Sequence, residues 1–277
     1  MSVVEQMLKR YDLASNEDSA NALREVMQEI ALAGLYRGGF FDKAAFYGGT
    51  CLRVFYGLKR FSEDLDFSLL QADTAFSLEP YFRTIEDEFN AFGFKVEIVA
   101  KQKSVASDIE SAFLKKNSSI YDVQVLGRKT TKIKFEVDTN PPLGFAVEER
   151  LLIHPYSFYV KCFSLPDLFA GKMHALLYRQ WKNRVKGRDW FDFEWYVKRG
   201  VVLNLSHFVE RAVQSGGLVD DSFNESDFLD LVQEKIRQLD VVSARRDIVR
   251  FIKDPLQIEI WSQEYFLQLA QMMKIES

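Results

Sequence analysis

Two short segments carry the residues with the clearest chemical potential. The glycine pair Gly48-Gly49 and Thr50 precede a short helical pattern, and two acids, Asp64 and Asp66, follow it with one apolar residue between them. Because strand side chains alternate between faces, both acids point the same way while the residue between them faces the core. Two carboxylates held side by side repel each other, and a divalent cation with oxygen ligands is the usual reason for such a pair. The N–H groups of a glycine turn that opens a helix can bind phosphates. The two segments together therefore predict a nucleotide-triphosphate site.

Either segment alone is weak evidence, because glycine pairs and Asp-x-Asp also occur in turns and on surfaces. Their order is more specific: a glycine turn, a helix, a loop and a carboxylate strand are what a nucleotidyl-transfer site needs. A metal-assisted displacement at phosphorus commonly uses a third carboxylate. The strand predicted at 132–138 offers Glu136 as the first choice and Asp138 as the second, both on its polar face. The alternative interpretation is a half-buried edge strand with a solvated charged face.

The C-terminal half offers further charged candidates. Lys172 lies among apolar helical residues, where it either snorkels to the surface or serves as a point charge for phosphates. Asp189 and Asp192 are three residues apart on one predicted helix face, and surface salt bridges are an equally good interpretation of them. Between Lys172 and Arg199 the chain has eight Lys and Arg against three acids, an excess of five positive charges. This basic stretch fits a local phosphate-binding patch or, more simply, a solvated helix face.

Composition limits the class of protein. The 277 residues are 47% hydrophobic and 27% charged, a globular balance with room for one large or two modest domains. The net charge of −4 argues against a protein that is basic overall, although a local patch remains possible. Two cysteines without metal spacing fit a reducing compartment. The sequence has no apolar run that predicts a signal peptide or membrane span, so we expect a soluble, cytoplasmic protein without a membrane partner.

Periodicity predicts a mixed α+β half and then a helical half, with a domain boundary near Ser164 that separates residues 1–163 from 164–277. Ser164 and Pro166 suit the N-cap and first turn of the helix that opens the second half. The predicted helices are 21–36, 50–56 and 78–92, and the predicted strands are 43–47, 65–69, 94–99, 111–114, 132–138 and 158–162.

Four motifs in this order resemble those of the AbiEii toxins, nucleotidyltransferase-like proteins of type IV toxin–antitoxin and phage-abortive-infection systems. The first is Gly48-Gly49-Thr50-x-Leu-Arg53 with Arg60-Phe-Ser62-x-Asp64-Leu-Asp66-Phe. The others are the Lys-x-Glu strand at 133–139, the lysine-bearing helix at 165–176 and the Arg-Asp-x-x-Asp segment at 186–192. The match covers residues 46–197, a little over half of the chain.

This resemblance implies a DNA-polymerase-β-like nucleotidyltransferase domain with a mixed sheet, followed by a helical C-terminal domain. It implies that Asp64, Asp66 and Glu136 bind Mg²⁺ or Mn²⁺, and that NTP is the substrate. It also implies that nucleotide-binding and catalytic roles fall to the residues Gly48, Gly49, Thr50, Arg53, Ser62, Lys172, Asp189 and Asp192.

The implied reaction transfers a nucleotide to RNA, with the 3′ end of tRNA as the favoured acceptor. An AbiEi-like repressor is the implied antitoxin, a functional partner that need not bind the toxin. The chain departs from the family pattern at Thr139-Asn140-Pro141, where Thr-Arg-Glu is common, and at Asp138, where a neutral Asn is common. The second departure leaves open which acid contacts metal.

Two other functions remain open from the sequence. The same site chemistry serves nucleotidyltransferases of small hydroxylated molecules such as antibiotics, although the basic stretch favours RNA. A non-catalytic nucleotide-binding regulator is the third reading, because a fold does not fix a function. The retained charges of Asp64, Asp66, Glu136 and Lys172 argue against it.

Overall fold

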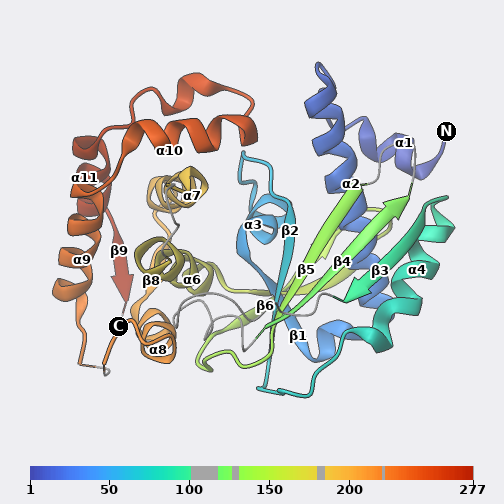
Figure 1. Ribbon diagram of the computed structural model, residues 1–277, viewed down its shortest axis with the longest axis horizontal. Helices are drawn as coiled ribbons and strands as arrows, with labels where there is room; N and C mark the ends of the chain where they lie inside the picture. The colour runs from blue at the N-terminus through green and yellow to red at the C-terminus, as the bar shows by residue number, and fades with distance from the viewer. Residues whose placement is uncertain (101–117, 127–130, 180–184, 220–221, 277) are drawn as a thin grey trace. The chain divides into compact units, whose positions relative to one another are not determined.

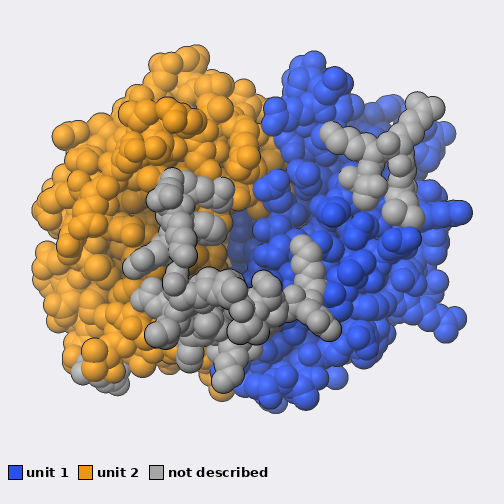
Figure 2. Space-filling view, viewed as in Figure 1, with its two compact units in different colours: residues 1–51, 63–141, 147–162 blue, residues 52–62, 142–146, 163–277 orange. Residues whose placement is uncertain are grey.

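The computed structural model describes residues 1–100, 118–126, 131–179, 185–219 and 222–276. The chain divides into two compact units, coloured separately in Figure 2. Unit 1 comprises residues 1–51, 63–141 and 147–162, and unit 2 comprises residues 52–62, 142–146 and 163–277. The strand predicted at 111–114 lies outside the described residues. None of the helices in the described ranges is long and apolar enough to cross a membrane.

Unit 1 is built on a seven-stranded mixed sheet in the order β3-β4-β5-β2-β1-β7-β6. At its centre β5 pairs in parallel with β2, while β1 pairs antiparallel with β2 and in parallel with β7. The 132–138 pattern therefore forms an interior strand, with β4 on its other side, and not the edge strand of the alternative interpretation. The unit contains α1 (Val3–Leu8), α2 (Asn16–Arg37), β1 (Ala44–Tyr47), the start of α3 (Gly48–Tyr56), β2 (Asp64–Leu69), α4 (Phe82–Ala91), β3 (Lys95–Ala100), β4 (Ser118–Leu126), β5 (Thr131–Asp138), β6 (Val147–Leu152) and most of β7 (Phe158–Phe163).

Alternation along β2 and β5 separates an apolar face from a polar one, as the sequence predicts. Leu65 and Phe67 on β2 are fully buried, and so are Ile133, Phe135 and Val137 on β5. The intervening acidic and basic residues are only half-buried. Helix α2 packs against α4 and β5 and closes the core of this unit (Figure 1).

Two predicted elements of unit 1 differ in extent. Helix α2 begins at Asn16, five residues before the predicted start, with Ser15 as its N-cap. The predicted helix 78–92 is a 3-10 turn, Glu79–Tyr81, followed by α4.

Unit 2 is helical and closes around aromatic side chains. Trp261, Phe193 and Phe266 are almost completely buried, and Phe169 stacks on Tyr196 at 4.4 Å between ring centroids. Two three-residue strands interrupt the helices and pair in parallel, which the sequence analysis did not predict. The unit contains α6 (Leu165–Tyr178), α7 (Gly187–Lys198), β8 (Val202–Asn204), α8 (Leu205–Gln214), α9 (Glu225–Arg237), α10 (Val241–Ile248), the 3-10 turns Val249–Phe251 and Pro255–Ile258, α11 (Gln263–Gln271) and β9 (Lys274–Glu276) (Figure 1).

The last eighty residues, whose contribution the sequence does not reveal, support α6 and α7. Helices α8 and α9 pack on α6, while α10 and α11 pack on α7. The carboxylate of Glu194 on α7 accepts hydrogen bonds from Trp261 Nε1 at 2.7 Å and from the Tyr265 hydroxyl at 2.5 Å. The C-terminal helices thus fix the orientation of the helix that carries the Arg-Asp-x-x-Asp segment.

Candidate active site

The glycine turn of unit 1 lies directly against one of the predicted metal ligands. Gly48 has φ of +81°, in the left-handed region that only glycine adopts readily. A Cβ atom at this position would lie 2.4 Å from Asp66 Oδ2. The antiparallel register pairs Tyr47 with Asp66, so strand pairing holds the acid beside the turn. Only glycine therefore allows the turn and the carboxylate to be this close.

Thr50 joins the first turn of α3 to the carboxylate strand. Its side chain is fully buried, and its hydroxyl donates a hydrogen bond of 2.5 Å to the backbone carbonyl of Asp64. This bond fixes the start of α3, with Gly49 in its first turn, relative to β2. The sequence analysis assigned Thr50 to nucleotide binding; the structure gives its hydroxyl a role in positioning, which leaves the backbone N–H groups of this turn as the groups suited to phosphate.

The three predicted metal-binding acids lie on the polar face of two neighbouring strands. The parallel register aligns Asp64 with Lys134 and Asp66 with Glu136. Asp138 lies two pairs further along, opposite Ser68, and its Oδ1 accepts a hydrogen bond from the backbone of Asn140 at 3.2 Å. This placement favours Glu136 over Asp138 as the third carboxylate.

Lys134 supplies positive charge to this group of acids. Its Nζ lies 2.5 Å from Glu136 Oε2. Burial lowers the pKa of Lys134, but Glu136 and then the nearby Asp64 and Asp66 outweigh burial and raise it above the ordinary value. One ammonium group therefore interacts with all three carboxylates, a contribution that the sequence analysis missed although the residue stood in the Lys-x-Glu motif.

The chemistry of these donors fits a hard divalent cation. Three carboxylates against one ammonium leave a local excess of negative charge, and Mg²⁺ and Mn²⁺ prefer such oxygen ligands. Within the part of the chain that the structure describes, no three acidic, histidine or cysteine side chains are yet arranged as a metal-binding group. Binding by all three acids would require Glu136 to exchange its ion pair with Lys134 for the metal.

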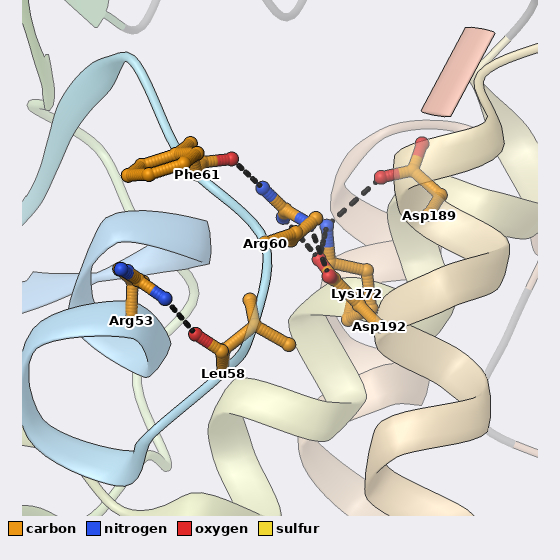
Figure 3. Close-up of polar contacts among 7 residues, drawn as sticks. All are labelled: Arg53, Leu58, Arg60, Phe61, Lys172, Asp189 and Asp192. Carbon is orange, nitrogen blue, oxygen red and sulfur yellow. Dashed lines mark hydrogen bonds and ion pairs between the residues drawn. The ribbon is translucent and has the colours of Figure 1, made fainter. Parts of the chain in front are cut away.

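In unit 2, Lys172, Asp189 and Asp192 form one buried ion-pair network with Arg60 (Figure 3). Lys172 Nζ lies 2.8 Å from Asp189 Oδ1 and 2.8 Å from Asp192 Oδ2. Arg60 binds both oxygens of Asp192, each at 2.6 Å, and donates a third hydrogen bond to the carbonyl of Phe61 at 3.0 Å. Asp192 is fully buried and Arg60 is 3% exposed, so these are not the surface salt bridges of the alternative interpretation.

Electrostatics keep this network charged. Burial raises the pKa of Asp189, but Lys172 and Lys186 outweigh it and lower the pKa to about 2. Burial likewise opposes ionisation of Asp192, yet Arg60 and Lys172 lower its pKa below the usual range. Burial lowers the pKa of Lys172, and its two acidic partners raise it above the ordinary value. All members of the network are therefore ionised at neutral pH.

Arg53 and Ser62 flank the same loop. Arg53 donates a hydrogen bond of 3.0 Å to the carbonyl of Leu58, and its guanidinium lies 4.9 Å from the centre of the Phe61 ring (Figure 3). Ser62 is 9% exposed. The structure thus gives Arg53 a role in holding the loop that presents Arg60, in addition to its predicted role in nucleotide binding.

Two unit-2 residues matter for reasons that local sequence patterns do not reveal. Arg60 belongs to the motif that contains Asp64 and Asp66, but its partner Asp192 lies 132 residues away. Gly187 allows α7 to approach α10, because a Cβ there would lie 2.0 Å from the carbonyl oxygen of Ala244. For Arg60 the only signal in the sequence was an arginine beside the carboxylate motif.

Several cations of the basic stretch between Lys172 and Arg199 already pair with acids or pack on aromatic rings. Lys198 pairs with Glu194, while Arg188 and Arg199 lie over the rings of Phe251 and Trp195 at 4.1 and 4.6 Å. Lys182 and Arg184 lie outside the described residues. Among the described members, Arg179 and Lys186 line a pocket.

Comparisons with known proteins were made against families, curated proteins and solved structures. The model of one family, described as "Nucleotidyl transferase AbiEii toxin, Type IV TA system", matches residues 30–272. A search of curated proteins gives no match. MenT4, a nucleotidyltransferase toxin from Mycobacterium tuberculosis, is 16% identical with a TM-score of 0.53, covering 96% of this chain and 87% of that one. A Helicobacter pylori protein described as a nucleotidyltransferase is 20% identical with a TM-score of 0.48, covering 89% of each chain. The likeness to MenT4 shows a shared fold, and the predicted fold class is confirmed.

Proposed function

Because this chain belongs to the AbiEii family of nucleotidyltransferase toxins of type IV toxin–antitoxin systems, we propose that it transfers a nucleoside monophosphate from NTP to RNA. The proposed acceptor is the 3′ end of tRNA, which places the reaction in the cytoplasm. The observation that supports this best is the position of Asp66, which lies on β2 beside Glu136 with its carboxylate packed against the Gly48 turn. This position supports the proposal because it holds N–H groups suited to phosphate beside oxygens suited to a metal ion.

In the proposed mechanism, Asp64, Asp66 and Glu136 hold Mg²⁺ or Mn²⁺, which when bound neutralises the triphosphate and the charge that develops on the attacking and leaving oxygens. The N–H groups of the first turn of α3 bind phosphate oxygens. The terminal hydroxyl of the RNA gives its proton to solvent water, and its oxygen attacks the α-phosphate in line. The new O–P bond forms as the bond to the β-phosphate breaks, and pyrophosphate leaves.

The remaining predicted residues have proposed supporting roles. Lys172 is proposed to contact nucleotide phosphates, and Asp189 and Asp192 keep its ammonium charged and fixed in position. Arg60 acts through Asp192 as a positioning residue. An AbiEi-like repressor is the proposed antitoxin, which opposes the toxin without needing to bind it.

The test is transfer of label from each α-³²P-NTP to total tRNA, with Mg²⁺ or Mn²⁺, by the natural chain and by Asp66→Asn. We expect label from one or two nucleotides, absent in the variant. Periodate oxidation of the tRNA 3′ terminus is the matched control and abolishes labelling if that hydroxyl is the acceptor. Label that survives oxidation would contradict the 3′ end. No label with any NTP would contradict the RNA reaction and favour a small hydroxylated acceptor or a binding protein.

A further inference from the structure

Unit 2 contains a pocket of about 270 Å³ to which the mechanism above assigns no ligand, although Asp189, one of its lining residues, also binds Lys172. It lies where the C-terminal ends of α6 and α9 meet the first turn of α7. This volume lies just below the range of roughly 300–1,000 Å³ for small-molecule sites. The pocket therefore suits one group of a small ligand and not a folded partner.

The charged side chains that line this pocket carry a positive excess. Arg179, Lys186 and Lys235 provide three positive charges, and Asp189 provides one negative charge, which gives +2. Asp189 is already engaged by Lys172 at 2.8 Å. The ammonium of Lys235 forms no hydrogen bond or ion pair with the part of the chain that the structure describes, and burial lowers its pKa. Among the described residues that line the pocket, the positive charges therefore outnumber the negative one.

Lys186 has the most unusual environment of the three cations. Burial lowers its pKa to about 8, Asp189 opposes that shift, and Arg179, Lys172 and Arg188 reinforce it. An anion bound beside Lys186, Arg179 and Lys235 would stabilise the charged form of each of them.

Compensation of helix dipoles explains only part of this arrangement. Lys235 lies in the last turn of α9 and Arg179 at the C-cap of α6, where positive charge is favoured. Lys186 occupies the N-cap of α7, where the helix dipole disfavours a cation. Lys186 thus places a positive charge at the positive end of the α7 dipole and also lines the pocket. An anionic ligand would offset both effects.

Apolar side chains also line the pocket. Leu176, Trp190 and Leu239 line it, and the Trp190 ring is fixed against Phe266 at 5.0 Å between centroids. These apolar side chains contribute little to the binding of an inorganic anion, whereas a ribose or a base packs against such side chains.

We propose that this pocket binds a phosphate group of a nucleotide through Arg179, Lys186 and Lys235, with the sugar or base against Trp190. The choice of a nucleotide rests on the proposed function. Two sources share this chemistry, the donor NTP and a nucleotide of the acceptor RNA. Arginine offers a planar pair of donors to phosphate and lysine a point charge, so the set suits this group.

The experiment is isothermal titration in EDTA, which prevents turnover, with each NTP, with pyrophosphate and with a six-nucleotide RNA without terminal phosphate. Lys235→Met and Lys186→Met remove pocket charges. Arg237→Met is the matched control, because it removes one positive charge from the same helix at an exposed position that does not line the pocket. We expect about tenfold or greater weakening in each pocket variant, and less than about twofold in the control.

Weakening for NTP and pyrophosphate alone identifies the donor as the ligand, and weakening for RNA alone identifies the acceptor. Lys186→Arg keeps the charge and restores binding, which separates loss of a ligand contact from misfolding. Binding that differs in no pocket variant from Arg237→Met, or no binding of any probe by the natural chain, overturns the proposal. Label transfer to tRNA is measured separately, so failure of the pocket and failure of the proposed reaction remain distinguishable.

Discussion

Replacement of Arg60 by methionine tests whether the buried network determines the stability of unit 2. The substitution keeps most of the apolar volume but removes both bonds to Asp192 and the bond to the carbonyl of Phe61. Loss of one partner of a buried ion pair costs about 3–5 kcal/mol. Asp192 keeps its second partner, Lys172, at 2.8 Å. We therefore expect a loss near the lower limit, about 3 kcal/mol, out of a total stability of roughly 5–15 kcal/mol.

Tryptophan fluorescence provides the assay, because all four tryptophans of the chain lie between residues 163 and 277, in unit 2. At an unfolding entropy of about 2.1 cal/mol/K per residue, a loss of about 3 kcal/mol lowers the melting temperature of the 131-residue unit 2 by about 11 °C. Lys59→Met is the matched control, since it removes one positive charge from the exposed neighbouring position. We expect the control to change stability by less than about 0.5 kcal/mol.

The pH dependence of the same variant gives an independent test. The folded-state pKa of Asp192 is lowered, so the ion pair contributes stability above the unfolded-state value of about 3.9. That contribution is lost as pH falls through the folded-state pKa. The difference between the natural chain and Arg60→Met should therefore shrink when pH is lowered from 7 toward 3. A melting temperature of Arg60→Met no lower than that of Lys59→Met, or a difference independent of pH, would refute the reasoning.

Three further predictions concern the two units. Gly48→Ala forces a Cβ against the Asp66 carboxylate, and the left-handed backbone costs alanine about 1–2 kcal/mol. The rate of label transfer should fall about 100-fold. An unchanged rate would contradict the close packing of the turn against Asp66. Lys134→Met removes the ammonium that competes with a metal, so Mn²⁺ measured by titration should bind about tenfold more tightly; equal or weaker binding would count against that competition. The lowered pKa of Lys186, about 8, predicts that phosphate affinity falls between pH 7 and 9, and that Lys186→Arg removes this dependence; a pH profile shared by both would exclude Lys186 as its source.

Local pattern was sufficient where a residue's environment depends on its own strand or turn. The two-residue period predicted which faces of β2 and β5 are apolar, and Leu65 and Phe135 are fully buried as expected. The glycine pair predicted a helix that starts after it, at Thr50, whereas α3 begins two residues earlier and includes the pair in its first turn. The same alternation is present in β4, where Tyr121, Val123 and Val125 are buried, but it was not assigned as a strand.

Pairings between residues far apart in the sequence could not be predicted from local patterns. The Arg60–Asp192 pair spans 132 residues, and the short strand Val202–Asn204 finds its partner only at Lys274–Glu276. The sequence showed charges at the right positions, but only the fold reveals which charge faces which. The same limit applies to Lys134, which alternation places on the polar face without indicating that it serves three acids.

The most direct test of the central claim compares two neighbouring acids of β5 in the label-transfer reaction with tRNA. Glu136 lies opposite Asp66, whereas Asp138 lies two pairs further along and accepts a hydrogen bond from the backbone of Asn140. We predict that Glu136→Gln lowers the rate by about 100-fold or more, while Asp138→Asn stays within a few-fold of the natural chain. Equal losses in the two variants, or full activity of Glu136→Gln, would contradict the assignment of Asp64, Asp66 and Glu136 as the catalytic carboxylates.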